Sequence, residues 1–142
     1  MASKADFSEA EWQVLRWAVA DTITYLSMAE TGLWDTFKEA SAAAHYVASV
    51  RSTADDQLVR ELAGDTRTRR DKALTGDPGN VAGEAIDRVK LAVGIVARKA
   101  PEDLAAFKEL ILGVARATAE AAHGVGPGET TAIGRLESEL AA

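Results

Sequence analysis

The sequence has no cysteine, and this absence excludes several kinds of site. Disulfides, thiolate metal sites and cysteine nucleophiles all need that side chain. Histidine is scarce as well, with two residues in the 142-residue chain, and no Gly-x-Ser-x-Gly motif is present. Because no nucleophile stands beside a base, we expect a protein without catalytic residues and without a cofactor.

Long apolar runs are also missing. The longest stretch without Asp, Glu, Lys or Arg covers residues 40–50, which is shorter than the roughly 18–20 residues that span a bilayer. The first six residues, Met-Ala-Ser-Lys-Ala-Asp, lack the apolar segment of a signal peptide. We therefore expect a cytoplasmic protein with no membrane insertion.

Positive charge is in short supply. The net charge of −6 disfavours general nucleic-acid binding, which is driven by neutralisation of phosphates. One basic cluster stands out, and it consists of Arg67, Arg69, Arg70 and Lys72. Acidic residues interrupt this cluster and no aromatic side chain is interleaved for stacking, so a solvated helix face is the favoured interpretation. We expect no nucleic-acid partner.

Apolar residues at helical spacing are plentiful and make up 47% of the chain. The clearest example is residues 101–123, where proline suits the first helical position and Glu102 and Asp103 suit the positive end of the helix dipole. Its inward positions are Leu104, Phe107, Leu110, Ile111, Val114, Ala115, Thr118, Ala121 and Ala122. The polar strip, with Lys108 and Arg116, is narrow, so we expect this helix at the centre of a bundle.

The sharpest local signal lies near the start of the chain. Ser8 and Glu11 form a capping box, and Phe7 and Trp12 occupy the positions of a hydrophobic staple. The helix that follows is predicted to run to about Ala29. Its apolar positions surround most of its circumference, so it should pack directly against the helix of residues 101–123.

Four further helices complete the prediction. One runs from Leu33 to about Val50, and a short one is capped within residues 53–56 and ends at Gly64. A loop at residues 76–80 precedes a helix that Asn80 caps and that ends at the junction of Ala100 and Pro101. The last helix carries Ile133, Leu136 and Leu140. No strand pattern competes, so we predict an all-α bundle of six or seven helices in one domain, residues 1–142.

Three further features of the sequence are candidate sites. Glu120 and His123 share a helix face and form one arm of a Glu-x-x-His metal motif, but no second arm exists, so a solvated helix end is favoured. Asp21 lies on an apolar face, where it is best explained by a hydrogen bond to Tyr25 or to a basic group on another helix. The glycine-rich residues 124–128 lack the strand and the Gly-Lys-Ser/Thr ending of a phosphate loop, and Glu129 follows them.

The order of signals in the C-terminal half resembles a known family. Residues 100–103 read Ala-Pro-Glu-Asp before the long apolar helix, and residues 124–129 read Gly-Val-Gly-Pro-Gly-Glu before the last amphipathic helix. This is similar to the tellurite-resistance TerB-like family, which often reads Ala-Asp-Gly-x-Val-Ser-x-x-Glu here. Val125 and Glu129 match that pattern, Gly126 replaces the serine, and the aspartate is absent. A weak internal echo aligns Trp12, Leu15 and Val19 with Phe107, Leu110 and Val114.

The resemblance implies a compact helical domain with two pseudo-repeated halves, no established catalytic activity and a link to metal or oxyanion stress. It also implies a cation site at the helix junctions, which would fall on Glu30 and Glu129. We therefore expect a non-catalytic binding or scaffold domain with a protein partner or self-association. The alternative is a small carboxylate–histidine metal protein or enzyme that uses Glu120, His123 and Glu129.

Overall fold

The computed structural model describes the backbone of residues 2–29, 33–65, 78–120 and 127–141, and the side chains of residues 2–26, 42–65, 83–120 and 130–141. Within these ranges the chain is all-helical and contains no strand, as predicted. The α-helices are α1 (Glu9–Ala29), α2 (Leu33–Thr53), α3 (Gln57–Asp65), α4 (Pro78–Lys99), α5 (Leu104–Glu120) and α6 (Pro127–Ala141). Two short 3-10 helices, η1 (Lys4–Asp6) and η2 (Pro101–Asp103), precede α1 and α5.

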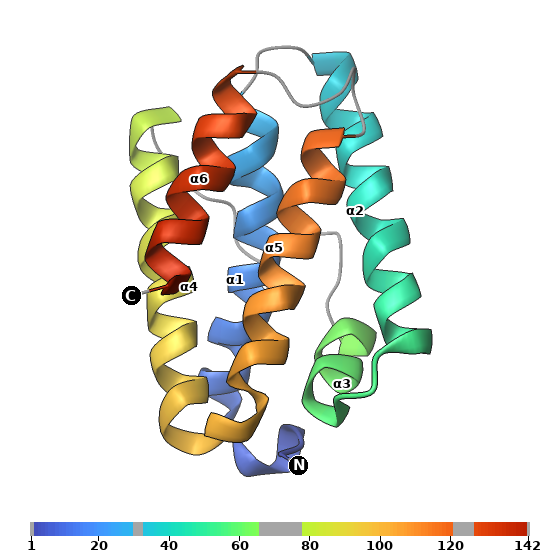
Figure 1. Cartoon of the computed structure of the whole chain (residues 1–142), viewed down its shortest axis with the longest axis vertical. Helices are drawn as coiled ribbons and strands as arrows, with labels where there is room; N and C mark the ends of the chain where they lie inside the picture. Colours follow the sequence, from blue (N-terminus) through green and yellow to red (C-terminus); the bar gives the residue numbers. More distant parts are fainter. Residues whose placement is uncertain (1, 30–32, 66–77, 121–126, 142) are drawn as a thin grey trace.

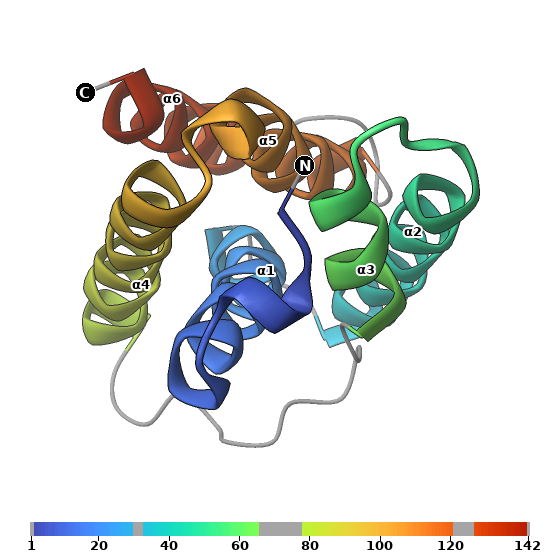
Figure 2. The same cartoon turned by 90° about the horizontal axis from the view of Figure 1, so that it is seen from below.

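The helix at the centre of the bundle is α1, and not α5 as its apolar pattern predicts. Seen from below, α1 is surrounded by α4, by α5 and α6, and by α2 and α3 (Figure 2). Both α1 and α5 pack against all of the other α-helices. However, none of residues 11–26 of α1 is exposed, whereas α5 keeps an exposed face that includes Ala105, Glu109 and Arg116. The charged strip of α5 must reach water, so α5 forms one wall of the bundle (Figure 1).

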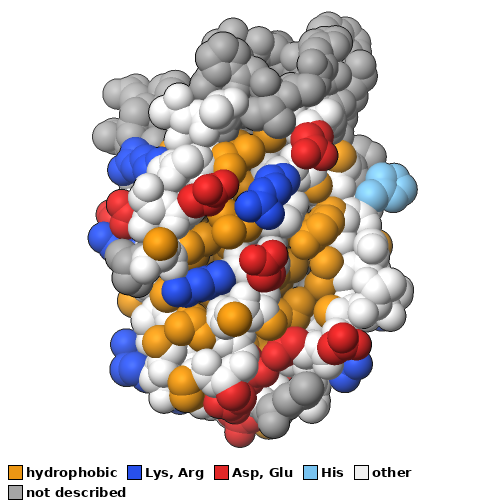
Figure 3. Space-filling view, in the orientation of Figure 1, with side chains coloured by type: hydrophobic (Ala, Val, Ile, Leu, Met, Phe, Trp, Pro, Cys, Tyr) orange, Lys and Arg blue, Asp and Glu red, His pale blue; other side chains and the backbone are white. Residues whose placement is uncertain are grey.

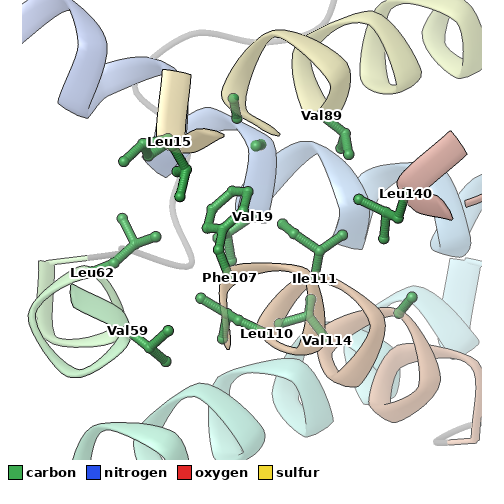
Figure 4. Close-up of a cluster of buried hydrophobic side chains, with 14 of the residues drawn as sticks. Leu15, Val19, Val59, Leu62, Val89, Phe107, Leu110, Ile111, Val114 and Leu140 are labelled. Atoms are coloured by element: carbon green, nitrogen blue, oxygen red, sulfur yellow. The ribbon is translucent and has the colours of Figure 1, made fainter. Parts of the chain in front are cut away.

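The core is one continuous cluster to which all six α-helices contribute. Large apolar side chains of five of them point toward one another (Figure 4): Leu15, Val19, Val59, Leu62, Val89, Phe107, Leu110, Ile111, Val114 and Leu140. Leu110 is 2% exposed, which confirms that it is buried. The six residues of the internal echo are all buried and belong to α1 and α5, which pack against each other.

The start of α1 is built as the sequence predicts. The Ser8 N–H donates to Glu11 Oε1 at 2.8 Å, and the Glu11 N–H donates to Ser8 Oγ at 3.1 Å, which completes the capping box. The rings of Phe7 and Trp12 lie 5.9 Å apart and form the staple. These contacts fix where the first helix begins.

Of two other predicted helix starts, one is confirmed and one is wrong. Helix α2 continues to Thr53, and Asp56, which lies within the predicted residues 53–56, caps α3 by accepting the Val59 N–H at 3.0 Å. Helix α4 begins at Pro78, which places Asn80 inside the helix. Proline at the first helical position needs no hydrogen bond from its nitrogen, so the helix starts three residues before residue 81, where an Asn80 cap would start it.

No helix in the described parts of the chain is long and apolar enough to span a membrane.

Candidate functional site

Of the four predicted metal ligands, only Glu120 has a side chain that the structure describes. Glu120 is exposed at the last residue of α5. Glu30 and His123 lie outside the described residues, and Glu129 is placed only by its backbone, in the first turn of α6. Among the side chains that are described, no group of three or more His, Cys, Asp or Glu is arranged to hold a metal ion. The basic cluster of residues 67–72 and most of the glycine-rich turn also lie outside the described residues.

Asp21 is a structural residue that joins two helices. It is fully buried on α1, and Arg88 of α4 donates to its Oδ2 at 2.6 Å. The Arg88 guanidinium also lies 4.9 Å from the centre of the Trp17 ring, at a distance typical of a cation–π contact. The prediction of a basic partner on another helix is confirmed, and this carboxylate is therefore committed to holding α1 against α4.

A second feature, which the sequence did not single out, is a groove between α2, α3 and α5. Its volume is about 290 Å³, and we call it the α2–α5 groove. The residues that line it are Tyr46, Val50, Ala54, Asp55, Asp56, Val59, Ala106, Glu109 and Leu110. An apolar strip is visible between α5 and α2, with acidic side chains beside it and at its lower end (Figure 3). The groove thus combines an apolar floor with an acidic edge.

Side-chain packing across the groove depends on a glycine. A Cβ atom at Gly113 would overlap the hydroxyl end of Tyr46, so the tyrosine from α2 can lie against α5 only because this position has no side chain. Burial, together with the nearby charge of Glu109, raises the pKa of Tyr46, and Arg116 opposes that effect. Tyr46 therefore remains a neutral hydrogen-bonding group at one wall of the groove.

At the acidic end of the groove, the carboxyl group of Asp56 lies against a buried carboxyl group from another helix start. Asp56 caps α3, and Asp103 belongs to η2 at the entrance of α5. Asp103 is 1% exposed, and its Oδ2 accepts the backbone N–H of Ala2 at 3.0 Å. Its Oδ1 is buried and receives no N–H donor from the described residues. The two carboxyl groups are close enough to hydrogen-bond to each other, which requires a proton on one of them.

The pKa of Asp56 responds to these surroundings. Partial burial, together with the hydrogen bond to Asp103 and the negative charge of that residue, raises the pKa of Asp56 to about 6. The backbone N–H groups of Val59 and Leu58 act in the opposite direction but do not cancel the rise. When Asp56 is protonated, it can donate to the Asp103 carboxylate. When Asp56 is ionised, two negative carboxylates face each other.

A scan of protein-family models, a search of curated proteins and a search of solved structures each found no match. The proposed function therefore rests on the residues of this chain.

Another cavity, of about 300 Å³, lies near the N-terminus, and three of its polar side chains already have partners. Lys4 pairs with Asp65 at 3.1 Å, Ser8 belongs to the capping box, and Gln13 accepts a hydrogen bond from Arg16 at 3.0 Å. A ligand would have to displace these contacts. The α2–α5 groove needs no such displacement, and we take it as the candidate site.

The groove escaped sequence analysis because its residues come from three separated segments. Asp56 and Asp103 each appear in the sequence as an acid at a helix start, which is a common structural role. Nothing in their spacing of 47 residues indicates that the two helix starts meet. Only the packing of α3 against α5 brings them together.

Proposed function

We propose that the protein is a non-catalytic binding module and that the α2–α5 groove is its binding site. The observation that carries this proposal is the groove itself, with an apolar floor, a tyrosine hydroxyl and an acidic edge. Binding sites for small molecules are generally apolar concavities with a few polar groups. A volume of about 290 Å³ places this groove at the small end of such sites.

Several features favour binding over catalysis. A carboxyl pair that shares a proton can act as a catalytic dyad when both groups reach the substrate. Here Asp103 is buried, and only Asp56 of the pair lines the groove. The one histidine whose side chain is described, His45, is exposed and does not line the groove.

The resemblance to TerB-like proteins supports the same type of function, because those proteins are helical sensing or scaffold domains. A role in metal or oxyanion stress belongs to this proposal as the biological context, and so does a protein partner. The proteins that co-purify with the full chain would test that context. The alternative of a carboxylate–histidine metal protein gains no support from the side chains that are described.

The proposal is tested by a screen of small fragments with two-dimensional NMR of the ¹⁵N-labelled protein. We expect fragment-induced shifts to concentrate at the amides of Val59, Ala106 and Leu110. Ala106→Trp fills the groove and should abolish these shifts. Ala105→Trp places the same side chain on the exposed face of α5 and should leave them intact. Fragments that bind equally well to both variants, or that shift amides elsewhere, would contradict the proposed site.

A further inference from the structure

We propose that the α2–α5 groove binds a small organic cation, an ammonium group carried on an apolar body. This inference rests on the proposed function and names the ligand class for the same site. The apolar body would lie on Val59 and Leu110, and the ammonium would lie at the end of the groove formed by Asp55 and Asp56.

Charge complementarity is the first argument. Among the described residues, the groove is lined by three acidic side chains, Asp55, Asp56 and Glu109, and by no lysine or arginine. Two described cations lie nearby, but both have other contacts. Arg116 is 3.7 Å from Glu137 of α6, and Arg60 donates to the Ala54 carbonyl at 3.4 Å. An incoming cation would therefore meet acidic side chains over an apolar surface.

The Asp56–Asp103 pair is a second argument. Buried polar atoms are almost always hydrogen-bonded, yet Asp103 Oδ1 is buried and has no hydrogen-bond partner among the described residues. If Asp56 is ionised, the pair carries two negative charges. An ammonium group at Asp56 would offset that repulsion, because it brings positive charge and three N–H donors to the same place.

Size and ligand number narrow the choice of occupant. A concavity of about 290 Å³ is close to the lower limit of about 300 Å³ for small-molecule sites, so it suits a small ligand. A metal ion needs several converging ligands, about six to eight oxygen atoms for calcium, and no described group of three acids or histidines is arranged in that way. A monovalent ammonium with an alkyl or aromatic body meets both limits.

Binding of such a cation is linked to the protonation of Asp56. Asp103 from η2 faces this carboxyl group, Asp55 lies beside it in the chain and Arg60 follows on α3, while Glu109 and Tyr46 line the same groove. With the pKa of Asp56 at about 6, the cation would displace the shared proton below that pH and meet an ionised carboxylate above it. Affinity for the cation should then be about tenfold weaker at pH 5 than at pH 8.

The test compares hexylammonium with 1-hexanol, a neutral molecule of similar length, by NMR titration of the full chain at pH 8. We expect hexylammonium to bind at least fivefold more tightly and to shift the amides of Val59, Ala106 and Leu110. Asp56→Asn should remove this preference, because asparagine keeps the helix cap but carries no charge. Asp87→Asn, which removes an exposed aspartate on α4, makes the same change in net charge and should leave the preference intact.

The other outcomes separate the two proposals. Equal binding of both probes in the groove would overturn the cation inference while leaving the proposed binding site in place. If neither probe shifts groove amides and the fragment screen is also negative, both proposals fail. Shifts spread over acidic side chains elsewhere would show a general surface effect and overturn the inference. Concentration-dependent shifts of the groove amides without any probe would mean that a second copy of the chain covers the groove, and would also overturn it.

Discussion

Two groups of carboxylates at helix ends have opposite surroundings. At the N-terminal corner, Glu11 lies 2.6 Å from the Lys99 ammonium, and Asp65 accepts the Trp12 indole N–H at 2.6 Å and pairs with Lys4. At the acidic end of the α2–α5 groove, Asp56 faces Asp103, a second carboxyl group. The first group holds each negative charge against a donor, whereas the second brings two acids together.

The pKa values of the two groups diverge accordingly. The hydrogen bond from Lys99, together with the Ser8 backbone N–H, lowers the pKa of Glu11 to about 2, and the contact with Trp12 lowers the pKa of Asp65. Burial and Asp103 raise the pKa of Asp56 to about 6. The comparison teaches that an acid at a helix start can be a satisfied cap or a group that still attracts a cation. The difference lies in what the tertiary fold places opposite it.

The largest expected effect concerns the apolar frame that holds Asp56 close to Asp103. Leu110→Ala should lower the free energy of unfolding by about 2–5 kcal/mol, because it empties a core position beneath the groove. Chemical denaturation would measure this change. Leu91→Ala is the matched control, since Leu91 is 53% exposed on α4 and its truncation should change stability by less than about 0.5 kcal/mol. A loss below about 1 kcal/mol for Leu110→Ala would show that the groove floor is not part of the rigid core.

The second prediction concerns the capping box of Ser8 and Glu11, which belongs to the carboxylates that have donors. Ser8→Ala removes the oxygen that accepts the Glu11 N–H, and should destabilise the protein by about 1 kcal/mol, the usual effect of losing an N-cap. Ser52→Ala is the control, because the Ser52 hydroxyl only donates to the Ala48 carbonyl within α2. Equal denaturation midpoints for Ser8→Ala and the unmodified protein would mean that the capping box does not stabilise α1.

The third prediction concerns the Asp56–Asp103 pair, where a substitution should stabilise the protein at pH 8. The pKa of Asp56 is raised in the folded protein, from 3.8 to about 6, so its stabilising contribution is complete below pH 3.8 and is lost as the pH rises through about 6. Asp56→Asn keeps a donor for Asp103 without the charge. At pH 8 it should raise the free energy of unfolding by about 0.5–1 kcal/mol, a value reduced for solvent screening.

The pH dependence supplies the control for that variant. Denaturation at pH 4 and pH 8 should show the unmodified protein losing stability with rising pH relative to Asp56→Asn, while Asp55→Asn should retain the same loss. A variant that is less stable than the unmodified protein at pH 8 would show that Asp56 and Asp103 do not repel each other there.

The parts of this comparison that depend on local contacts could be predicted from the sequence. The capping box of Ser8 and Glu11 lies within four residues, and the burial of Leu110 follows from helical spacing, so both could be predicted. The basic partner of Asp21 could be predicted as a type of residue but not as Arg88, because the packing of α1 against α4 decides which side chain arrives. The Asp56–Asp103 pair could not be predicted at all, since its two acids meet only through tertiary structure.

The central helix of the bundle was predicted as α5 and is α1, again because tertiary contacts decide the outcome. The apolar pattern of α5 is strong, but a pattern measures the face that a helix buries and not how many neighbours surround it. The polar positions of α1 are covered by partners such as Arg88 and Lys99, which belong to a distant part of the chain. Charged positions therefore indicate an exposed face only when no distant cation is available to cover them.

The smallest expected effect is a change in one pKa value. Lys99→Ala removes the ammonium that contributes most to the low pKa of Glu11, so the pKa of this carboxyl group should rise from about 2 toward its ordinary value of 4.5. The Ser8 N–H remains and should keep the pKa below that value. The Glu11 side chain keeps its stabilising contact at pH values above 4.5 and loses it as the pH falls through about 2, and the variant should move this loss to higher pH.

NMR titration of the Glu11 side-chain carboxyl carbon would measure this pKa. Lys90→Ala, which removes the partner of Glu139, is the control. An unchanged Glu11 pKa in Lys99→Ala would assign its low value to the helix cap alone, and the contrast with Asp56 would then rest on capping geometry and not on the ion pair.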